Sequence, residues 1–205
     1  MSLKDILFTK SEEKRFYYTN QAVAYKIAKS LYEWIPKDNK EIIILCIGTD
    51  RSTGDSLGPL VGSQLQDYHL NYLSIYGTLD APVHAKNLEE TIEEIHTNHN
   101  NSFVIAVDAC LGKQSSIGTI ITGHGPLKPG AAVQKKLPEI GHLHISGVVN
   151  MSGYMEYFVL QNTRLSIVMN MAKQISQSLR FLDYFLYKED QQILSNHVPN
   201  PNFNV

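Results

Sequence analysis

Two aspartates stand where residue type and position allow hydrolytic chemistry. Asp55 lies in the segment Gly54-Asp55-Ser56-Leu57-Gly58-Pro59, directly before a predicted helix, and Asp108 follows the apolar run 103–107. A helix N-terminus favours negative charge, so Asp55 can be held ionised there. A carboxylate at the end of a buried strand is desolvated, which raises its pKa unless it is paired. If the two carboxyl groups meet, they can share a proton or hold a metal between them, and either arrangement activates water for hydrolysis.

Each acid also has a structural interpretation. Asp55 taken alone is a plain helix N-cap, and Asp108 taken alone is a strand-end acid bonded to backbone amides. Asp50 is a third acid of the same loop. The pair favours a functional site because ligands of α/β proteins bind at the carboxyl ends of parallel strands, where both aspartates are expected.

Three further features of the sequence are candidate binding elements. The strand-to-helix loop contains Gly48, Gly54 and Gly58, and its backbone amides can bind an anion with the help of Arg51. The structural alternative is a tight turn with an exposed arginine. His124 ends a strand candidate at what is predicted to be the same edge, where it can serve as general base or metal ligand.

Alternating patterns predict the elements that must position these residues. Apolar runs predict strands, and apolar residues at helical spacing predict helices. We expect strands at 41–47, 72–76, 103–107, 117–122 and 143–149, and helices at 19–35, from Pro59, at 87–99, 151–161 and 164–186. Strands that alternate with helices imply an α/β fold, with a mostly parallel or mixed sheet covered on both faces in three αβα layers. The stretch from about residue 190 to 205 is predicted to be a loose tail.

Composition restricts the class of protein. The chain has 205 residues, 43% of them hydrophobic and 19% charged, with a net charge of −2, so we expect a single α/β domain, 1–205, that does not bind nucleic acid. No apolar run is long enough for a membrane span, and the first 15 residues lack the apolar core of a secretory signal. Two cysteines, Cys46 and Cys110, are too few for a disulfide framework and favour a cytoplasmic location.

Four blocks resemble one known family. These are residues 47–61, Val107-Asp108-Ala109, Lys128-Pro129-Gly130 and residues 145–150. Together they resemble the YyaC family of sporulation proteins, which are distant relatives of the germination protease that degrades small acid-soluble spore proteins. Hydrogenase-maturation endopeptidases share the same α/β core.

The resemblance implies a fold and roles for individual residues. The fold is the three-layer phosphorylase/hydrolase-like one. Asp55 and Asp108 match the positions of the two catalytic aspartates of the germination protease. In the hydrogenase-maturation enzymes, acids at the two corresponding places and a histidine bind a metal, and His124 is assigned here to that histidine.

Three functions remain open at this point. The first is an aspartic-type peptidase in sporulation or germination, which uses Asp55 and Asp108 without a cofactor. The second is a metal-dependent hydrolase with a divalent metal on Asp55, Asp108 and His124, and the third is a sporulation protein that binds a partner without cutting it. The resemblance implies a protein or peptide substrate, with small acid-soluble spore proteins as candidates, and a forespore or spore-core location. Tyr184, Phe185 and Tyr187 suggest a homo-oligomer interface, with core packing as the alternative.

Overall fold

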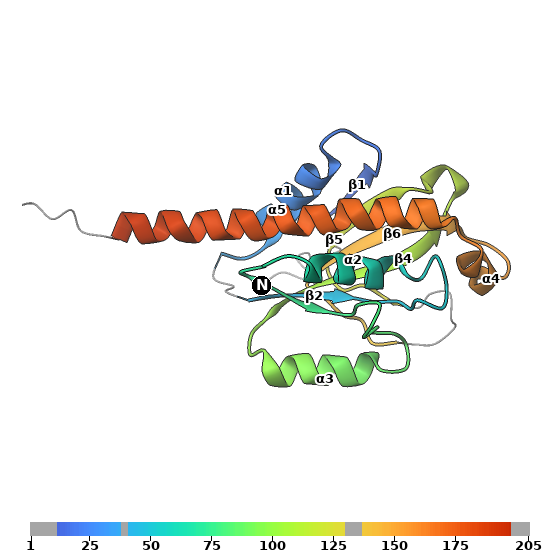
Figure 1. Cartoon of the computed structure of the whole chain (residues 1–205), viewed down its shortest axis with the longest axis horizontal. Coiled ribbons are helices and arrows are strands. Elements are labelled where there is room, and N and C mark those ends of the chain that lie inside the picture. The colour runs from blue at the N-terminus through green and yellow to red at the C-terminus, as the bar shows by residue number, and fades with distance from the viewer. Residues whose placement is uncertain (1–11, 38–40, 130–136, 198–205) are drawn as a thin grey trace, which may run out of the picture.

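A six-stranded sheet carries the other elements of the molecule. The computed structural model describes residues 12–37, 41–129 and 137–197 (Figure 1). The strand order is β1-β5-β6-β4-β2-β3, in which β3, β2, β4 and β6 run parallel while β1 and β5 are antiparallel to their neighbours. This confirms the predicted α/β class with a mixed sheet. The strands are β1 Glu13–Tyr17, β2 Ile42–Cys46, β3 Leu73–Tyr76, β4 Phe103–Gly112, β5 Thr119–His124 and β6 Leu143–Met151.

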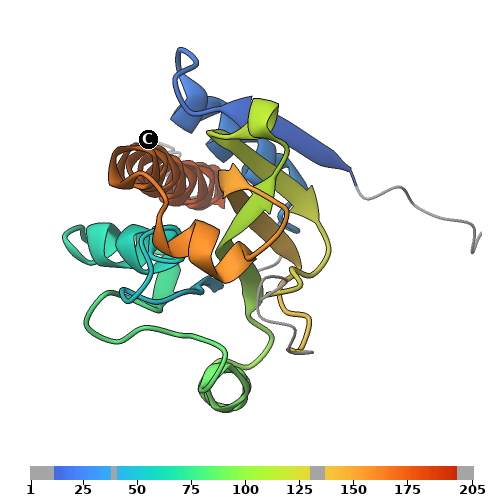
Figure 2. The same cartoon turned by 90° about the vertical axis from the view of Figure 1, so that its right-hand side faces the viewer.

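Helices cover the two faces of the sheet unequally (Figures 1 and 2). One face carries α1 Val23–Trp34, α2 Leu57–Gln66 and α5 Leu165–His197, whereas the other carries α3 Leu88–Asn98. A short α4, Glu156–Gln161, and the 3-10 turn Gln114–Ser116 complete the described elements.

The sheet separates two apolar cores because successive strand residues point to opposite faces. On β2, Ile42 and Ile44 pack toward α1, α2 and α5, while Ile43 and Leu45 pack toward α3. Among the described residues, no side chain of β1, β5 or β6 belongs to the buried core under α3. No helix of the described segments therefore covers the β6-β5-β1 part of that face.

Three boundaries differ from the sequence expectation. Asp108 does not end its strand, since β4 continues to Gly112 and Asp108 pairs with Ser146 of β6. The helix predicted at 151–161 is confined to Glu156–Gln161. The predicted tail is helical as far as His197, and residues 198–205 lie outside the described part. Strand β1 was not predicted at all.

Side-chain contacts attach α5 to the rest of the molecule as far as Asp190. The Tyr32 hydroxyl donates to a Glu189 carboxylate oxygen at 2.8 Å, and the Lys37 ammonium lies 2.8 Å from the other oxygen. The Tyr72 hydroxyl donates to Asp190 at 2.8 Å. These contacts attach the helix to α1 and to the start of β3, which sequence periodicity alone does not show.

A buried carboxylate connects α5 to the chain that enters β3. Asp183, only 5% exposed, accepts the backbone N–H of Asn71 at 3.0 Å and that of Tyr72 at 2.9 Å. A buried carboxylate needs such partners, because leaving it without them costs several kcal/mol. Asp183 therefore positions the edge strand relative to the long helix.

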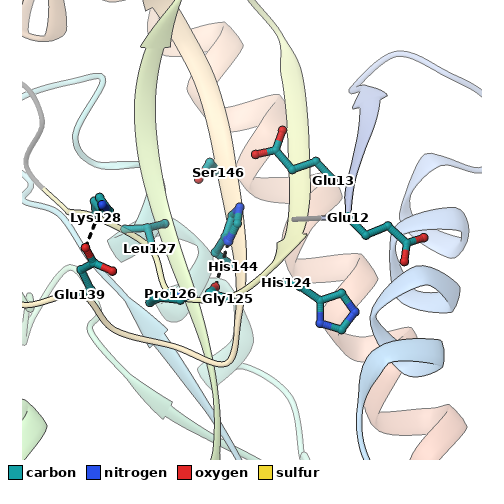
Figure 3. A pocket seen from close by; sticks show the side chains of 10 residues that line it. All are labelled: Glu12, Glu13, His124, Gly125, Pro126, Leu127, Lys128, Glu139, His144 and Ser146. Atoms are coloured by element: carbon teal, nitrogen blue, oxygen red, sulfur yellow. Dashed lines mark hydrogen bonds and ion pairs between the residues drawn. The ribbon is translucent and has the colours of Figure 1, made fainter. Parts of the chain in front are cut away.

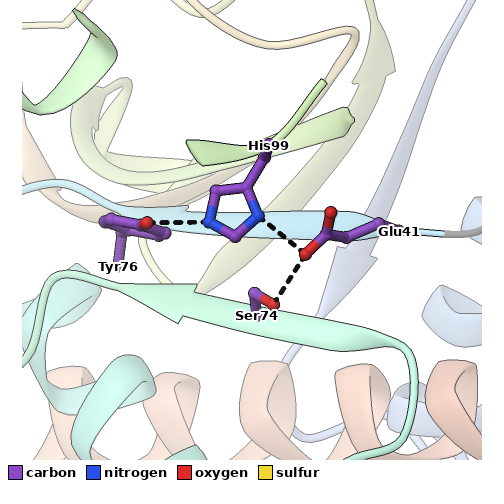
Figure 4. Close-up of polar contacts among 4 residues, drawn as sticks. All are labelled: Glu41, Ser74, Tyr76 and His99. Atoms are coloured by element: carbon purple, nitrogen blue, oxygen red, sulfur yellow. Dashed lines mark hydrogen bonds and ion pairs between the residues drawn. The ribbon is translucent and has the colours of Figure 1, made fainter. Parts of the chain in front are cut away.

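A second polar cluster connects α3 to β2 and β3 (Figure 4). The His99 Nδ1 lies 2.7 Å from Glu41 Oε1, and its Nε2 lies 2.8 Å from the Tyr76 hydroxyl. The Ser74 hydroxyl donates to the same Glu41 oxygen at 3.4 Å. This cluster holds the C-terminal end of α3 against the sheet.

No helix within the described ranges has the length and apolar character needed to cross a membrane.

The Asp183 contacts predict a specific loss of stability. Asp183→Ala leaves the N–H groups of Asn71 and Tyr72 without their acceptor, so the free energy of unfolding should fall by about 2 kcal/mol. For a chain of this size that corresponds to a midpoint roughly 4–8 °C lower in a thermal melt. Asp190→Ala is the matched control, because this exposed residue accepts one hydroxyl bond, and it should lower the midpoint by less than half as much. Equal losses in both variants would contradict the assigned role of Asp183.

Candidate active site

The structure brings Asp55 and Asp108 to the same two cavities. The first, here called the loop cavity, has a volume of about 250 Å³ and is bounded by the loop that follows β2. The second, here called the strand cavity, has a volume of about 140 Å³ and is bounded by residues 108–111 of β4. Asp55, Asp108 and Leu160 line both cavities, so the two acids lie where the cavities adjoin.

The loop that presents Asp55 folds back on itself. Gly48 has a φ of +145°, which disfavours any other residue, and an added Cβ would overlap the carbonyl oxygen of Asp55. That carbonyl accepts the N–H of Thr49 at 3.1 Å. The Asp55 backbone is therefore fixed directly beside the end of β2.

The three glycines of the loop allow close backbone packing, and two of the three amides in the anion-binding prediction are already engaged. The Gly54 N–H donates to the Leu160 carbonyl at 2.9 Å, and the Gly48 N–H donates to that of Val83 at 2.8 Å. Gly58 lies inside α2, where an added Cβ would overlap the Ile47 carbonyl. Because the amides of Gly48 and Gly54 are used within the protein, neither is free to hold an anion or an oxyanion.

The electrostatics of the two acids disfavour ionisation of both at once. Asp108 is 7% exposed, and this burial raises the pKa of its carboxyl well above the ordinary aspartate value. The negative charge of Asp55 raises the pKa of Asp108 further, while the Ala109 N–H, which donates to its Oδ1 at 2.7 Å, opposes the shift. Burial also raises the pKa of Asp55. Burial and the charge of Asp55 thus both favour the protonated form of Asp108.

Asp50 and Arg51, the other two predicted residues of this loop, differ in their position relative to the cavities. Asp50 is exposed, accepts a hydrogen bond from the Thr49 hydroxyl at 3.4 Å and lines neither of these cavities. Arg51 is exposed and lines the loop cavity together with Lys86. Across the described part of the chain, neither cation has an ion-pair partner. Arg51 therefore contributes a positive charge to the loop cavity, whereas Asp50 does not belong to the site.

His124 does not join the two aspartates. Its ring lies 4.7 Å from that of Trp34, and it lines a separate outer cavity of about 870 Å³ with Glu13 and His144 (Figure 3). The reason is topological, because β6 separates the His124 strand from the Asp108 strand. Leu127, Lys128 and Ser146 line both the outer cavity and the strand cavity, so the two adjoin.

Two residues of the loop cavity carry a buried polar atom without a partner among the described residues. His84 and Ser52 both line it, and in each a buried polar atom, Nδ1 or Oγ, has no hydrogen-bond partner in the described residues. Buried polar atoms are normally paired, so these two are available to a bound molecule. His84 reaches this position because Val83 bridges Ile47 in parallel, a contact with no signal in the sequence.

The described residues do not fit a three-ligand metal centre. Asp55 and Asp108 supply two carboxylates that suit a divalent cation, but His124 lies elsewhere. Over residues 12–37, 41–129 and 137–197, no three or more His, Cys, Asp and Glu side chains gather as a ligand set. The chemistry considered below is therefore assigned to the aspartates themselves.

Comparison with known proteins places the chain in a family. A family described as "Protein of unknown function (DUF1256)" matches residues 15–178. The chain belongs to this family. It is 52% identical over 194 residues to "Uncharacterized protein YyaC" of Bacillus subtilis (strain 168), covering 93% of this chain and 95% of that protein. The resemblance to YyaC is thus confirmed.

A solved structure with the same fold is a [NiFe] hydrogenase maturation protease, HycI, from Thermococcus kodakarensis KOD1. The TM-score is 0.51 at 16% sequence identity, with 77% of this chain and 99% of that one covered. The expected likeness to the hydrogenase-maturation enzymes is therefore confirmed at the level of the fold.

The raised pKa of Asp108 predicts how its replacement affects stability. A carboxyl group whose pKa is raised by folding destabilises the folded state as pH increases from its ordinary pKa toward the raised one. Asp108→Asn keeps an acceptor for the Ala109 N–H and removes the charge, so it should increase the free energy of unfolding at pH 8 by roughly 1 kcal/mol or more, because one pKa unit corresponds to about 1.4 kcal/mol. Near pH 4 the gain should disappear.

Urea unfolding of both proteins at several pH values measures this effect. Asp50→Asn is the control, because Asp50 is exposed, and it should show no comparable dependence. A stability gain for Asp108→Asn that does not vary between pH 4 and pH 8 would contradict the electrostatic explanation.

Proposed function

We propose that the protein is an aspartic-type peptidase in which Asp55 and Asp108 activate a water molecule. The observation that carries this proposal is the position of both carboxyl groups at the junction of two cavities, with the pKa of each raised by burial. Carboxyl pairs that share one proton are suited to hydrolysis, because one acts as base while the other acts as acid.

The difference in burial assigns a role to each acid. Asp108 is the more deeply buried of the two, so it retains the shared proton, while the less buried Asp55 is ionised. The Asp55 carboxylate accepts a proton from water as the water oxygen attacks the peptide carbonyl carbon, and Asp108 donates its proton to the carbonyl oxygen. When the tetrahedral intermediate collapses, the C–N bond breaks, Asp55 gives its proton to the leaving amine and Asp108 recovers its own from the hydroxyl.

A role in sporulation is part of the proposal. Its support is the 52% identity to YyaC together with the four sequence blocks that resemble the sporulation family. Small acid-soluble spore proteins are the first substrates to examine, and the forespore or spore core is the proposed location.

Substitution of the two acids tests the mechanism. Asp55→Asn and Asp108→Asn should each reduce cleavage by at least about a hundredfold, which is the lower range for loss of an acid or base catalyst. The assay is release of fragments from fluorescein-labelled casein and from purified small acid-soluble spore proteins, with cut sites identified by mass spectrometry. Asp50→Asn, in the same loop but outside the cavities, should retain full activity. Equal cleavage by all four proteins would reject the mechanism, and tight binding of a spore protein without any cleavage would favour the non-catalytic function.

Removal of divalent metal separates the two hydrolytic mechanisms. With Asp55 and Asp108 acting alone, dialysis against EDTA should leave the cleavage rate within about twofold, because no step depends on a metal. Elemental analysis of the active protein before and after dialysis is the companion measurement. Loss of activity that one divalent cation restores would instead support the metal-dependent hydrolase.

A further inference from the structure

The start of helix α4 and the two residues before it expose a group of large apolar side chains. Four of the five residues from 154 to 158 are large and apolar, and their exposed fractions are 91% for Tyr154, 56% for Met155, 58% for Tyr157 and 57% for Phe158. Single exposed apolar residues are common on soluble proteins, but a group of adjacent ones marks a contact surface. These four residues are called the α4 surface below.

The segment that carries the α4 surface is fixed to the site. The Leu160 carbonyl accepts the Gly54 N–H at 2.9 Å, which ties α4 to the loop of Asp55. On the other side, the Asn150 side-chain amide donates to the Val159 carbonyl at 3.2 Å and to the Thr163 hydroxyl at 3.1 Å. The α4 surface is therefore exposed on a helix that is hydrogen-bonded to the rest of the molecule at several points.

The α4 surface is continuous with the cavities of the two aspartates. Tyr157 belongs to the α4 surface and also lines the loop cavity, to which Leu160 contributes from the next helical turn. Glu156, between the exposed residues, lines the strand cavity. A chain that contacts Tyr157 consequently lies at the edge of the cavity that holds Asp55 and Asp108.

We propose that the α4 surface binds an apolar segment of the polypeptide substrate, adjacent to the peptide bond held at Asp55 and Asp108. This inference rests on the proposed function and specifies the substrate as an extended chain with bulky apolar residues next to the cleaved bond. Large aromatic side chains are the residues that most often dominate binding energy in such contacts. The remainder of the substrate lies along the cavities that already contain the two acids.

A second copy of the chain is a less suitable occupant of the α4 surface. Because Tyr157 lines the loop cavity, a folded partner seated on it would cover the opening to Asp55 and Asp108. An extended substrate segment on the α4 surface does not block the cavity, because the same chain can continue into it. The location of the surface thus favours a chain that continues into the site.

Binding to a cleavage-deficient protein tests the proposal independently of activity. In the Asp108→Asn background, a fluorescein-labelled 12-residue Gly/Ser peptide with a central Leu-Phe-Leu block should bind at least tenfold more tightly than an all-Gly/Ser peptide of the same length. Adding Tyr154→Ser and Phe158→Ser should weaken binding of the apolar peptide about tenfold, to the affinity of the all-Gly/Ser peptide. Fluorescence anisotropy gives both affinities.

The matched control removes two exposed aromatic residues from another surface. Tyr184→Ser with Tyr187→Ser, at exposed positions of α5 outside both aspartate cavities, should leave both affinities unchanged. In the active protein, Tyr154→Ser with Phe158→Ser should raise KM for labelled casein about tenfold at unchanged kcat. Thermal melts of the variants establish that they remain folded.

Several outcomes would overturn the proposal. These are equal affinity for the two peptides, an equal loss in the α5 control variant, and a dimer in sedimentation velocity that Tyr154→Ser with Phe158→Ser dissociates. Preferential binding of the apolar peptide without cleavage of any substrate would support the docking surface while rejecting the peptidase. Cleavage with an unchanged KM in the Tyr154→Ser, Phe158→Ser variant would support the peptidase and reject the docking surface.

Discussion

The burial of one carboxyl group beside another is the constraint on which the rest of the site depends. Asp108 lies within β4, still paired with Ser146 of β6, and shares its cavities with Asp55. Such burial is unfavourable for two charges, because little water remains to solvate them, and it is tolerated where one group retains a proton. The surrounding apolar core supplies the stability that offsets this cost, and both carboxyl groups line the same two cavities.

Tight backbone packing maintains that proximity. Gly48 lets the loop return to the end of β2, and Gly54 lets α4 approach closely enough for the Leu160 carbonyl to accept its N–H. The amides used in these contacts are the ones that an anion-binding loop would need to keep free. The glycine-rich turn therefore positions Asp55. The proposed substrate would be bound by other groups, among which are His84 and Ser52, whose buried atoms have no partner in the described ranges, and the exposed residues of the α4 surface.

The uneven covering of the sheet explains why space for a chain exists near the acids. Helix α3 covers β2 and the start of β4, whereas the part of that face formed by β6, β5 and β1 has no helix in the described residues. The strand cavity adjoins the outer cavity through Leu127, Lys128 and Ser146, so the space extends from the aspartates toward His144 and Glu13. The proposed peptidase would thus hold its substrate across an open sheet, between α4 on one side and polar side chains on the other.

The sequence alone determined the α/β class and five of the six strands, because apolar periodicity reports local structure. It also indicated Asp55 and Asp108 as a candidate pair, because both follow apolar runs or loops near the carboxyl ends of parallel strands. It could not determine the strand order, which places β6 between β4 and β5 and so separates His124 from the aspartates. It could not place His84 at the site, which depends on the parallel bridge between Val83 and Ile47, nor show the polar contacts that attach α5 near residue 190. These features arise from contacts between residues far apart in the chain, and only the tertiary structure decides which distant residues meet.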